Sequence, residues 1–182
     1  MSLMEVEVKF PLSKYDLEAI KASLSKTYTF IKKIVQEDIY FTHPSINFND
    51  RVLRLRKENG KVTLTYKGPR VSYNLKVREE LEVEVSEFNE MKEILRRLGF
   101  IEVGLIRKIR EVYSVNGITV NLDFVEGLGY FIEIEVISDS TNLDLVTNKI
   151  KDIALSLGLN LKRALSISYF ELLQEKRKKK LS

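Results

Sequence analysis

The chain has 182 residues, of which 44% are hydrophobic and 31% are charged, and its 30 Lys and Arg residues exceed its 26 Asp and Glu residues. Because it has no cysteine and one histidine, disulfide frameworks, Cys/His zinc sites and Cys–His nucleophilic catalysis are excluded. No apolar run reaches the roughly 20 residues of a membrane span, and no signal peptide is evident, so we expect a single cytoplasmic domain over residues 1–182.

Alternating apolar and charged residues predict eight strands, and apolar residues at helical spacing predict four helices. Turn signals such as "KENGK", "VNG" and "EGLG" separate several of the strands. In chain order we expect a strand at 4–10, a helix at 12–24, strands at 28–42, 51–57, 61–67 and 72–85, a helix at 87–98, strands at 100–114, 118–125 and 130–137, and helices at 143–157 and 168–179.

A faint internal repeat indicates how these strands are organised. The segment "MEVEVKFPLSKYDLEAIKASL" is similar to "LEVEVSEFNEMKEILRRLGF", and each copy runs from a charged strand into a helix and is followed by three more strands. Two such halves predict an α+β fold, a closed eight-stranded antiparallel β-barrel with helices packed outside it, which leaves no free sheet edge. Two unrelated clusters of strands are the alternative.

Nearly every predicted strand has one ionic face and one apolar face. We expect the helices to cover the apolar faces, because an exposed apolar band around eight strands would aggregate. The ionic faces would then line the interior of the barrel, an arrangement that is costly unless a ligand compensates it. A flat sheet with its ionic face in water is the alternative, although like charges bunch along single strands, as in Glu80, Glu82 and Glu84.

The lining predicts the ligand. Carboxylates are hard ligands that suit Mg²⁺ or Mn²⁺, and five of them lie on the ionic faces: Glu5, Glu7, Asp123, Glu133 and Glu135. Basic groups that suit phosphate oxygens lie on the same faces: Lys9, Arg54, Arg56, Lys67, Arg78, Lys108 and Arg110. A metal with a dense set of cations is typical of phosphoryl-transfer sites, and so many cations favour a polyphosphate.

These residues carry a resemblance to a known family. "EVEVK" resembles the ExExK signature of the CYTH domain, or triphosphate tunnel metalloenzymes, which includes class IV adenylate cyclases, thiamine triphosphatases and inorganic triphosphatases. "LRLRK", "LTYKGP", "REELEVEV", "KIREVY", "LDFVEGLGYFIEIEV" and "SYFELL" follow in the family's order. The overall pattern is most similar to the class IV adenylate cyclase branch.

The resemblance implies an eight-stranded triphosphate tunnel and a role for each charged group. It implies metal binding by Glu5, Glu7, Glu133 and Glu135 with Asp123 close by, and triphosphate binding by Lys9, Arg54, Arg56, Lys67, Lys108 and Arg110. Glu80 and Glu82 match an acidic pair for which a second metal or the positioning of water is implied. Together with Glu5, Glu7 and Lys9, this pair forms the expected catalytic set.

The expected reaction converts ATP to cyclic AMP and pyrophosphate. Hydrolysis of a terminal phosphate, from tripolyphosphate or thiamine triphosphate, is the first alternative, and a polyphosphate- or nucleotide-binding module without turnover is the second. We expect a small-molecule triphosphate and no membrane as partners, and a homodimer is compatible with this interpretation. The basic run "KRKKK" at 176–180 is interpreted as a solvated helix end, so nucleic acid is not an expected partner.

Overall fold

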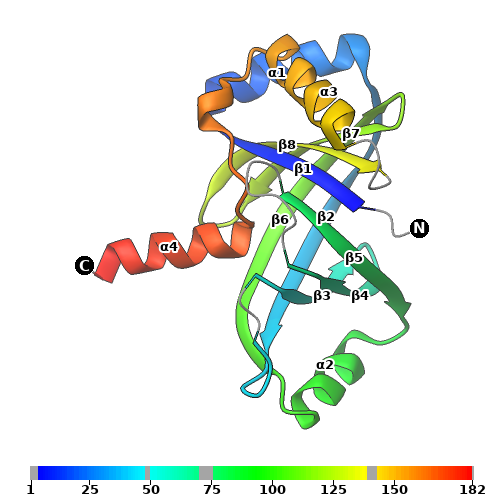
Figure 1. Ribbon diagram of the computed structural model, residues 1–182, viewed down its shortest axis with the longest axis vertical. Coiled ribbons are helices and arrows are strands. Elements are labelled where there is room, and N and C mark those ends of the chain that lie inside the picture. Colours follow the sequence, from blue (N-terminus) through cyan, green and yellow to red (C-terminus); the bar gives the residue numbers. More distant parts are fainter. Residues whose placement is uncertain (1–3, 48–49, 70–75, 139–142, 182) are drawn as a thin grey trace.

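The protein is a strongly curled antiparallel sheet of eight strands with helices on its outer side (Figure 1). This computed structural model describes residues 4–47, 50–69, 76–138 and 143–181. The strands are β1 (Met4–Leu12), β2 (Thr29–Thr42), β3 (Val52–Glu58), β4 (Lys61–Lys67), β5 (Lys76–Val85), β6 (Ile101–Val115), β7 (Ile118–Val125) and β8 (Gly129–Ser138). The α-helices are α1 (Lys14–Thr27), α2 (Phe88–Arg97), α3 (Leu143–Ser156) and α4 (Tyr169–Leu181), and a short 3₁₀ turn spans Leu161–Arg163.

Each predicted strand and helix is present, with ends that shift by a few residues. The largest difference within the described residues is at α1, which spans Lys14–Thr27 where 12–24 was expected. The expected start of β5 at 72 lies outside the described residues. No helix in the described part of the chain is long and apolar enough to cross a bilayer.

Hydrogen bonding follows the order β1-β5-β4-β3-β2-β6-β7-β8, and β8 pairs with β1. The pairings differ in length around this ring. The β2–β6 pair runs from Thr29–Ser114 to Thr42–Ile101, and among the described residues β1 pairs with β5 from Met4–Glu79 to Glu7–Lys76. The eight antiparallel strands are confirmed as a strongly curled sheet, but the evenly closed barrel is not confirmed.

The strand order has the symmetry that the internal repeat predicts. Each half of the chain reads strand, helix and three strands, from β1 to β4 and from β5 to β8. If each strand is exchanged for the one four places later, every pairing in the ring maps onto another pairing: β1–β8 onto β5–β4, for example, and β2–β3 onto β6–β7. The fold therefore has a pseudo-twofold axis through the β1–β5 and β2–β6 pairs.

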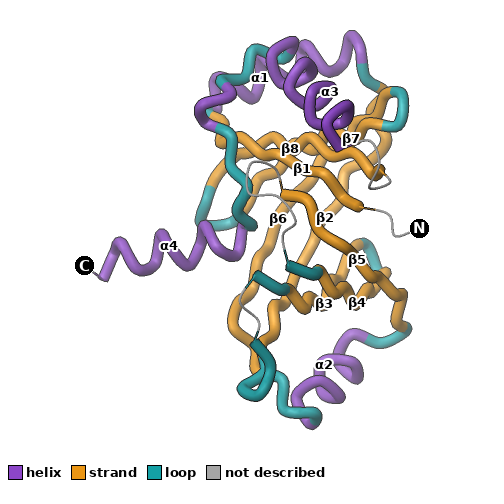
Figure 2. The backbone as a smooth tube through the Cα atoms, in the orientation of Figure 1, coloured by secondary structure: helices purple, strands orange, loops and turns teal. Residues whose placement is uncertain are grey.

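The helices pack on three parts of the sheet (Figure 2). On the outer face, α1 and α3 pack on β1, β7 and β8, and α2 packs on β2, β3 and β4 at the opposite end. The first turns of α4 instead contact inward-facing residues of β2 and β6, Tyr40 and Ile106.

The expectation that helices cover every apolar face is wrong in two regions. On β5, Leu81 and Val83 are 58% and 56% exposed. Val35, Ile109 and Phe124 form a row across β2, β6 and β7 and stay 62%, 40% and 43% exposed.

The start of α4 is fixed by a close approach to β6. A Cβ atom at Gly104 would lie 2.2 Å from Cε2 of Phe170, whose ring stacks on Tyr40 with centroids 4.8 Å apart. We therefore expect Gly104→Ala to displace Phe170 and to lower the free energy of unfolding by about 1–3 kcal/mol. Urea denaturation measures this change, with Gly68→Ala as the control, because Gly68 has no positive φ and an added Cβ there would meet its nearest neighbour, Cβ of Glu79, at an ordinary 3.6 Å. An unchanged stability would show that Phe170 is not tightly held.

Candidate active site

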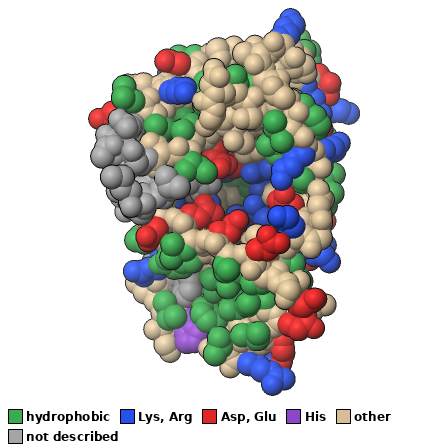
Figure 3. Space-filling view, turned by 90° about the vertical axis from the view of Figure 1, so that its right-hand side faces the viewer, with side chains coloured by type: hydrophobic (Ala, Val, Ile, Leu, Met, Phe, Trp, Pro, Cys, Tyr) green, Lys and Arg blue, Asp and Glu red, His purple; other side chains and the backbone are tan. Residues whose placement is uncertain are grey.

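The curled sheet encloses a cavity of about 420 Å³, and eleven of the sixteen residues that line it are charged. In the space-filling view, acidic and basic groups gather around a hollow in the middle of one face (Figure 3). The lining residues come from seven strands and the start of α4: Glu7, Lys9, Tyr40, Val52, Arg54, Arg56, Lys67, Glu80, Glu82, Lys108, Arg110, Glu133, Glu135, Ile137, Ser168 and Tyr169.

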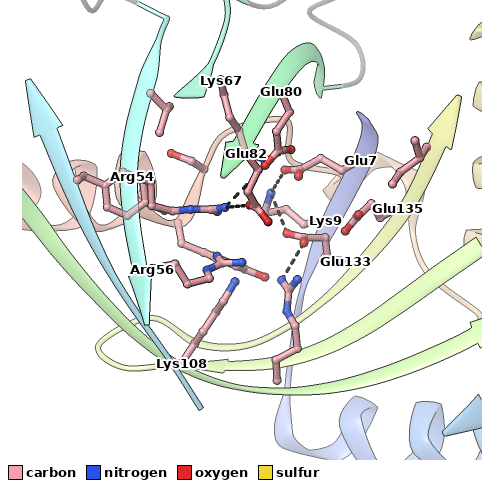
Figure 4. Close-up of a pocket in the computed structure, with 16 residues that line it drawn as sticks. Glu7, Lys9, Arg54, Arg56, Lys67, Glu80, Glu82, Lys108, Glu133 and Glu135 are labelled. Atoms are coloured by element: carbon pink, nitrogen blue, oxygen red, sulfur yellow. Dashed lines mark hydrogen bonds and ion pairs between the residues drawn. The ribbon is translucent and has the colours of Figure 1, made fainter. Parts of the chain in front are cut away.

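Strand periodicity explains why these residues meet. Alternate residues of one strand point to the same side of the sheet, so Glu7 and Lys9 of β1, or Glu133 and Glu135 of β8, project together toward the interior (Figure 4). The structure brings together eleven of the expected site residues: Glu7, Lys9, Arg54, Arg56, Lys67, Glu80, Glu82, Lys108, Arg110, Glu133 and Glu135. Glu5 has its backbone in β1, but its side chain lies outside the described residues.

Two expected site residues have different positions. Asp123 is fully buried behind the lining, where both of its carboxylate oxygens accept hydrogen bonds from Arg110, at 2.7 and 2.6 Å. It therefore orients a cation and is not placed as a direct metal ligand. Arg78 is buried with its Nη2 3.2 Å from Asp50, and it does not line the cavity as the described residues define it.

The cations and carboxylates of the cavity are paired with each other. Lys9 Nζ lies 2.9 Å from Glu7 and 3.4 Å from Glu133, and Lys67 Nζ lies 2.9 Å from Glu80. Arg110 Nη2 reaches Glu133 at 2.8 Å. Burial alone would lower the pKa of Lys9, but the Glu7 and Glu133 carboxylates outweigh it and raise that pKa above its ordinary value. Lys9 is therefore charged across the physiological range.

Arg54 has a buried donor that lacks an acceptor. Its Nη2 donates to Thr65 Oγ1 at 3.1 Å and lies 3.7 Å from both Glu80 and Glu82, while its buried Nε has no hydrogen-bond partner among the described residues. A buried donor without an acceptor costs free energy. An anion in the cavity would supply the missing acceptor.

Three carboxylates gather on one wall, from Glu7, Glu133 and Glu135. Burial, and then the negative charge of Glu133, raises the pKa of Glu135 above its ordinary value, so these groups repel one another. Among the described side chains, no three acidic or histidine groups are close enough to enclose a metal ion. The set still fits Mg²⁺ or Mn²⁺, because Mg²⁺ is typically held by one or two carboxylates, by waters and by the phosphates of its substrate.

Lys108 is fully buried on β6 and faces the cavity. Its nearest carboxylate oxygen is Oδ2 of Asp123, at 3.9 Å. Burial and the neighbouring Arg110 guanidinium lower the pKa of Lys108 to about 7. Near neutral pH, the protonation of Lys108 therefore depends on its surroundings, and a bound anion would favour the protonated form.

The sequence analysis missed two buried groups that hold these cations. Asp38 on β2 binds Arg56 through both of its oxygens, at 2.6 and 2.7 Å. Tyr169 at the start of α4 donates its hydroxyl hydrogen to Asp123 at 2.7 Å. Asp38 was recoverable, since it alternates with Gln36 and Tyr40 along β2, whereas Tyr169 follows no strand pattern.

A second cavity of about 530 Å³ adjoins the charged one. Tyr40 and Val52 line both cavities, and so form part of the wall between them. The second cavity is otherwise lined by uncharged and aromatic groups such as Phe41, His43 and Phe170, with Arg51 as its charged member.

Comparison with known proteins places the chain in a family. The CYTH domain matches residues 3–168. A Methanocaldococcus jannaschii protein named "Putative adenylate cyclase" is 40% identical over 174 residues, which are 93% of this chain and 98% of that protein. Adenylate cyclase CyaB of Aeromonas hydrophila is 27% identical over 94% of this chain and 89% of its own length.

Solved structures agree with this fold. The PH1819 protein of Pyrococcus horikoshii superposes with a TM-score of 0.85, at 41% identity, and the match covers 95% of this chain and 99% of that one. An adenylyl cyclase-like protein of Hippeastrum superposes with a TM-score of 0.70 at 20% identity, over 96% of each chain, which shows likeness of fold alone. The match to the CYTH domain over most of its length shows that this chain belongs to the CYTH-domain family.

Proposed function

We propose that the protein is an enzyme that acts on a triphosphate with Mg²⁺ or Mn²⁺, and that its reaction is the cyclisation of ATP to cyclic AMP and pyrophosphate. The observation that supports this most is the pairing of charges in the cavity. The six cations that line it face five lining carboxylates, so neither a bare anion nor a bare cation would be well matched.

A metal–triphosphate complex would match both sets at once. The carboxylates of Glu7, Glu133 and Glu135 would hold the metal, and their cationic partners would turn to phosphate oxygens. The ion pairs of the cavity, such as Lys9–Glu7 and Arg110–Glu133, would thus be exchanged and not simply lost. The metal would supply neutralisation of the charge that develops on the phosphate oxygens.

The remaining roles belong to the protein's own side chains. Arg54 and Arg56 on β3 and Lys67 on β4 would bind phosphates from one wall, and Lys108 would approach them from β6. In the cyclisation, the ribose 3′-oxygen attacks the α-phosphorus, the bond from that phosphorus to the bridging oxygen breaks to release pyrophosphate, and the hydroxyl proton passes to water. Cations that bind the departing pyrophosphate would stabilise the negative charge that it gains.

The second cavity favours a nucleotide over inorganic triphosphate. A nucleoside needs more space than the phosphates, and the cavity beyond Tyr40 and Val52 provides about 530 Å³ next to the charged site. The names of the Methanocaldococcus and Aeromonas relatives agree with a cyclase.

Hydrolysis of a terminal phosphate is the second candidate. The cavity that holds the charges is complete without the second cavity, so it would suit tripolyphosphate by itself. The Hippeastrum neighbour is described as an adenylyl cyclase-like protein with a dominant triphosphatase activity.

One assay separates these reactions. The protein is incubated with ATP, thiamine triphosphate or tripolyphosphate, each with Mg²⁺ and with Mn²⁺, and the products are identified by chromatography. Cyclic AMP with an equal amount of pyrophosphate is the expected result. Orthophosphate without a cyclic product would establish the hydrolase instead, and tight binding of all three compounds without turnover would indicate a binding module.

A further inference from the structure

We propose that Tyr169 is a positioning residue for triphosphate binding, whose ring holds the Lys9 and Lys108 ammonium groups in place and whose hydroxyl fixes Asp123 against Arg110. This role rests on the proposed function, because it assumes that these cations bind a triphosphate.

The ring of Tyr169 is shared by two cations. The Nζ atoms of Lys9 and Lys108 each lie 5.2 Å from its centroid. An ammonium group within about 6 Å of an aromatic ring is attracted by the electron-rich face, most strongly where water is excluded. Tyr169 is 5% exposed, and both lysines are buried, so this attraction operates out of water.

The hydroxyl of Tyr169 serves a third cation. It donates to Oδ2 of Asp123 at 2.7 Å, and the same oxygen accepts a hydrogen bond from Arg110 at 2.6 Å. Burial, and then the Asp123 carboxylate, raises the pKa of the Tyr169 hydroxyl far above its ordinary value, so it stays a donor. Tyr169 is thereby in contact with three elements of the phosphate-binding set, through Lys9, Lys108 and the Asp123–Arg110 pair.

The position of Tyr169 is itself fixed from two sides. Just before α4, Leu165 forms an antiparallel bridge with Lys9, through a 2.8 Å bond from Leu165 N to Lys9 O and a 3.3 Å bond in the reverse direction. The first turn of α4 is closed by reciprocal bonds between Ser168 and Glu171, at 3.1 and 2.6 Å. The backbone that carries Tyr169 is thus tied to the strand residue whose ammonium group the ring contacts.

A general packing role is the competing explanation, since Tyr169 also contacts Phe131 edge-on with centroids 5.1 Å apart. The two roles differ in what they require of the ring. Packing depends on its shape, whereas the attraction of ammonium groups depends on its electron density, which fluorine removes with little change in size.

The experiment measures tripolyphosphate binding by calorimetry in EDTA, so that no metal or turnover is involved, and at pH 6, where Lys108 carries its proton. It compares the wild type, Tyr169→Phe, and a protein with 3,4,5-trifluorophenylalanine at position 169. We expect Tyr169→Phe to bind tripolyphosphate about threefold more weakly than the wild type, because the bond to Asp123 is lost. We expect the trifluorophenylalanine protein to bind about 10-fold more weakly than Tyr169→Phe. Trifluorophenylalanine at Phe131 is the matched control, because no cation–π contact to Phe131 is found in the described part of the chain.

Thermal unfolding of each protein verifies that the fold is kept. Equal affinities for the Phe and trifluorophenylalanine proteins, or an equal loss from fluorination at Phe131, would overturn this role alone. If the wild-type protein binds no tripolyphosphate in EDTA, the same series is measured with Mg²⁺ present, and a wild-type protein that binds none under either condition would overturn the proposed function together with this role.

Discussion

Lys108→Met is expected to make the protein more stable and to weaken its binding of triphosphate. The ammonium group is buried, and burial together with Arg110 lowers its pKa from 10.5 to about 7. The unfolded chain keeps the ordinary value, so between pH 7 and 10.5 unfolding takes up a proton and stability rises with pH. Below pH 7 the full cost of burying the charge is present, and methionine removes it.

The size of the effect follows from the shift. A change from 10.5 to about 7 corresponds to about 5 kcal/mol, and we expect about 2–4 kcal/mol of added stability at pH 6.5, with little gain at pH 10. Affinity for tripolyphosphate should fall at least about 10-fold at pH 6.5. Urea denaturation and calorimetry measure the two effects. Lys61→Met, at an exposed lysine of β4, should change neither by much. A less stable Lys108→Met protein with normal affinity would contradict the assignment of Lys108.

Glu135→Gln is expected to abolish most of the activity while the fold becomes slightly more stable. Glutamine has the shape of glutamate but lacks the charge that a hard metal ligand needs, so kcat/KM should fall at least about 100-fold. The pKa of Glu135 is raised by burial and by Glu133, so its ionised form is disfavoured in the folded protein. The free energy of unfolding therefore falls as pH rises through that raised pKa. Glutamine should restore this stability at pH 7.5, whereas at pH 4, where Glu135 is protonated, it should change little.

The control for this substitution is Glu84→Gln. Glu84 is an exposed carboxylate on β5 that pairs with Lys61 of β4. This variant should leave both activity and stability close to those of the wild type. Titration of Mn²⁺ in the presence of tripolyphosphate gives an independent readout, because only Glu135→Gln should weaken metal binding. Full turnover in Glu135→Gln would exclude Glu135 from the metal site.

Much of this site was predictable because a strand repeats every two residues. The alternation of side chains along a strand was enough to place Arg54 with Arg56, and Glu133 with Glu135, on the inner face, where the structure has them. This alternation gives the side of the sheet on which a side chain lies but not how deeply it is buried, which is why Asp123 was expected to be a metal ligand. It is on the inner face, yet Arg110 and Tyr169 occupy both of its oxygens.

What could not be predicted depends on contacts distant in sequence. Tyr169 reaches the cavity because Leu165 joins the edge of β1 and turns the chain inward, and no local pattern encodes that bridge. The incomplete cover of the outer face has a similar origin, since the length of a helix does not tell which strands it lies on. The row at Val35, Ile109 and Phe124 stays exposed because the helices pack elsewhere.

The pseudo-twofold arrangement of strands has a consequence for how a ligand can be oriented. A lumen built from two identical halves would present the same charges to both ends of a triphosphate, which could then bind in either direction. Here the equivalent strands differ: β3 and β4 carry Arg54, Arg56 and Lys67, whereas β7 and β8 carry Asp123, Glu133 and Glu135. Divergence of the halves has thus given the lumen a polarity, and a polar lumen can tell the nucleoside end of a nucleotide from its free phosphate end.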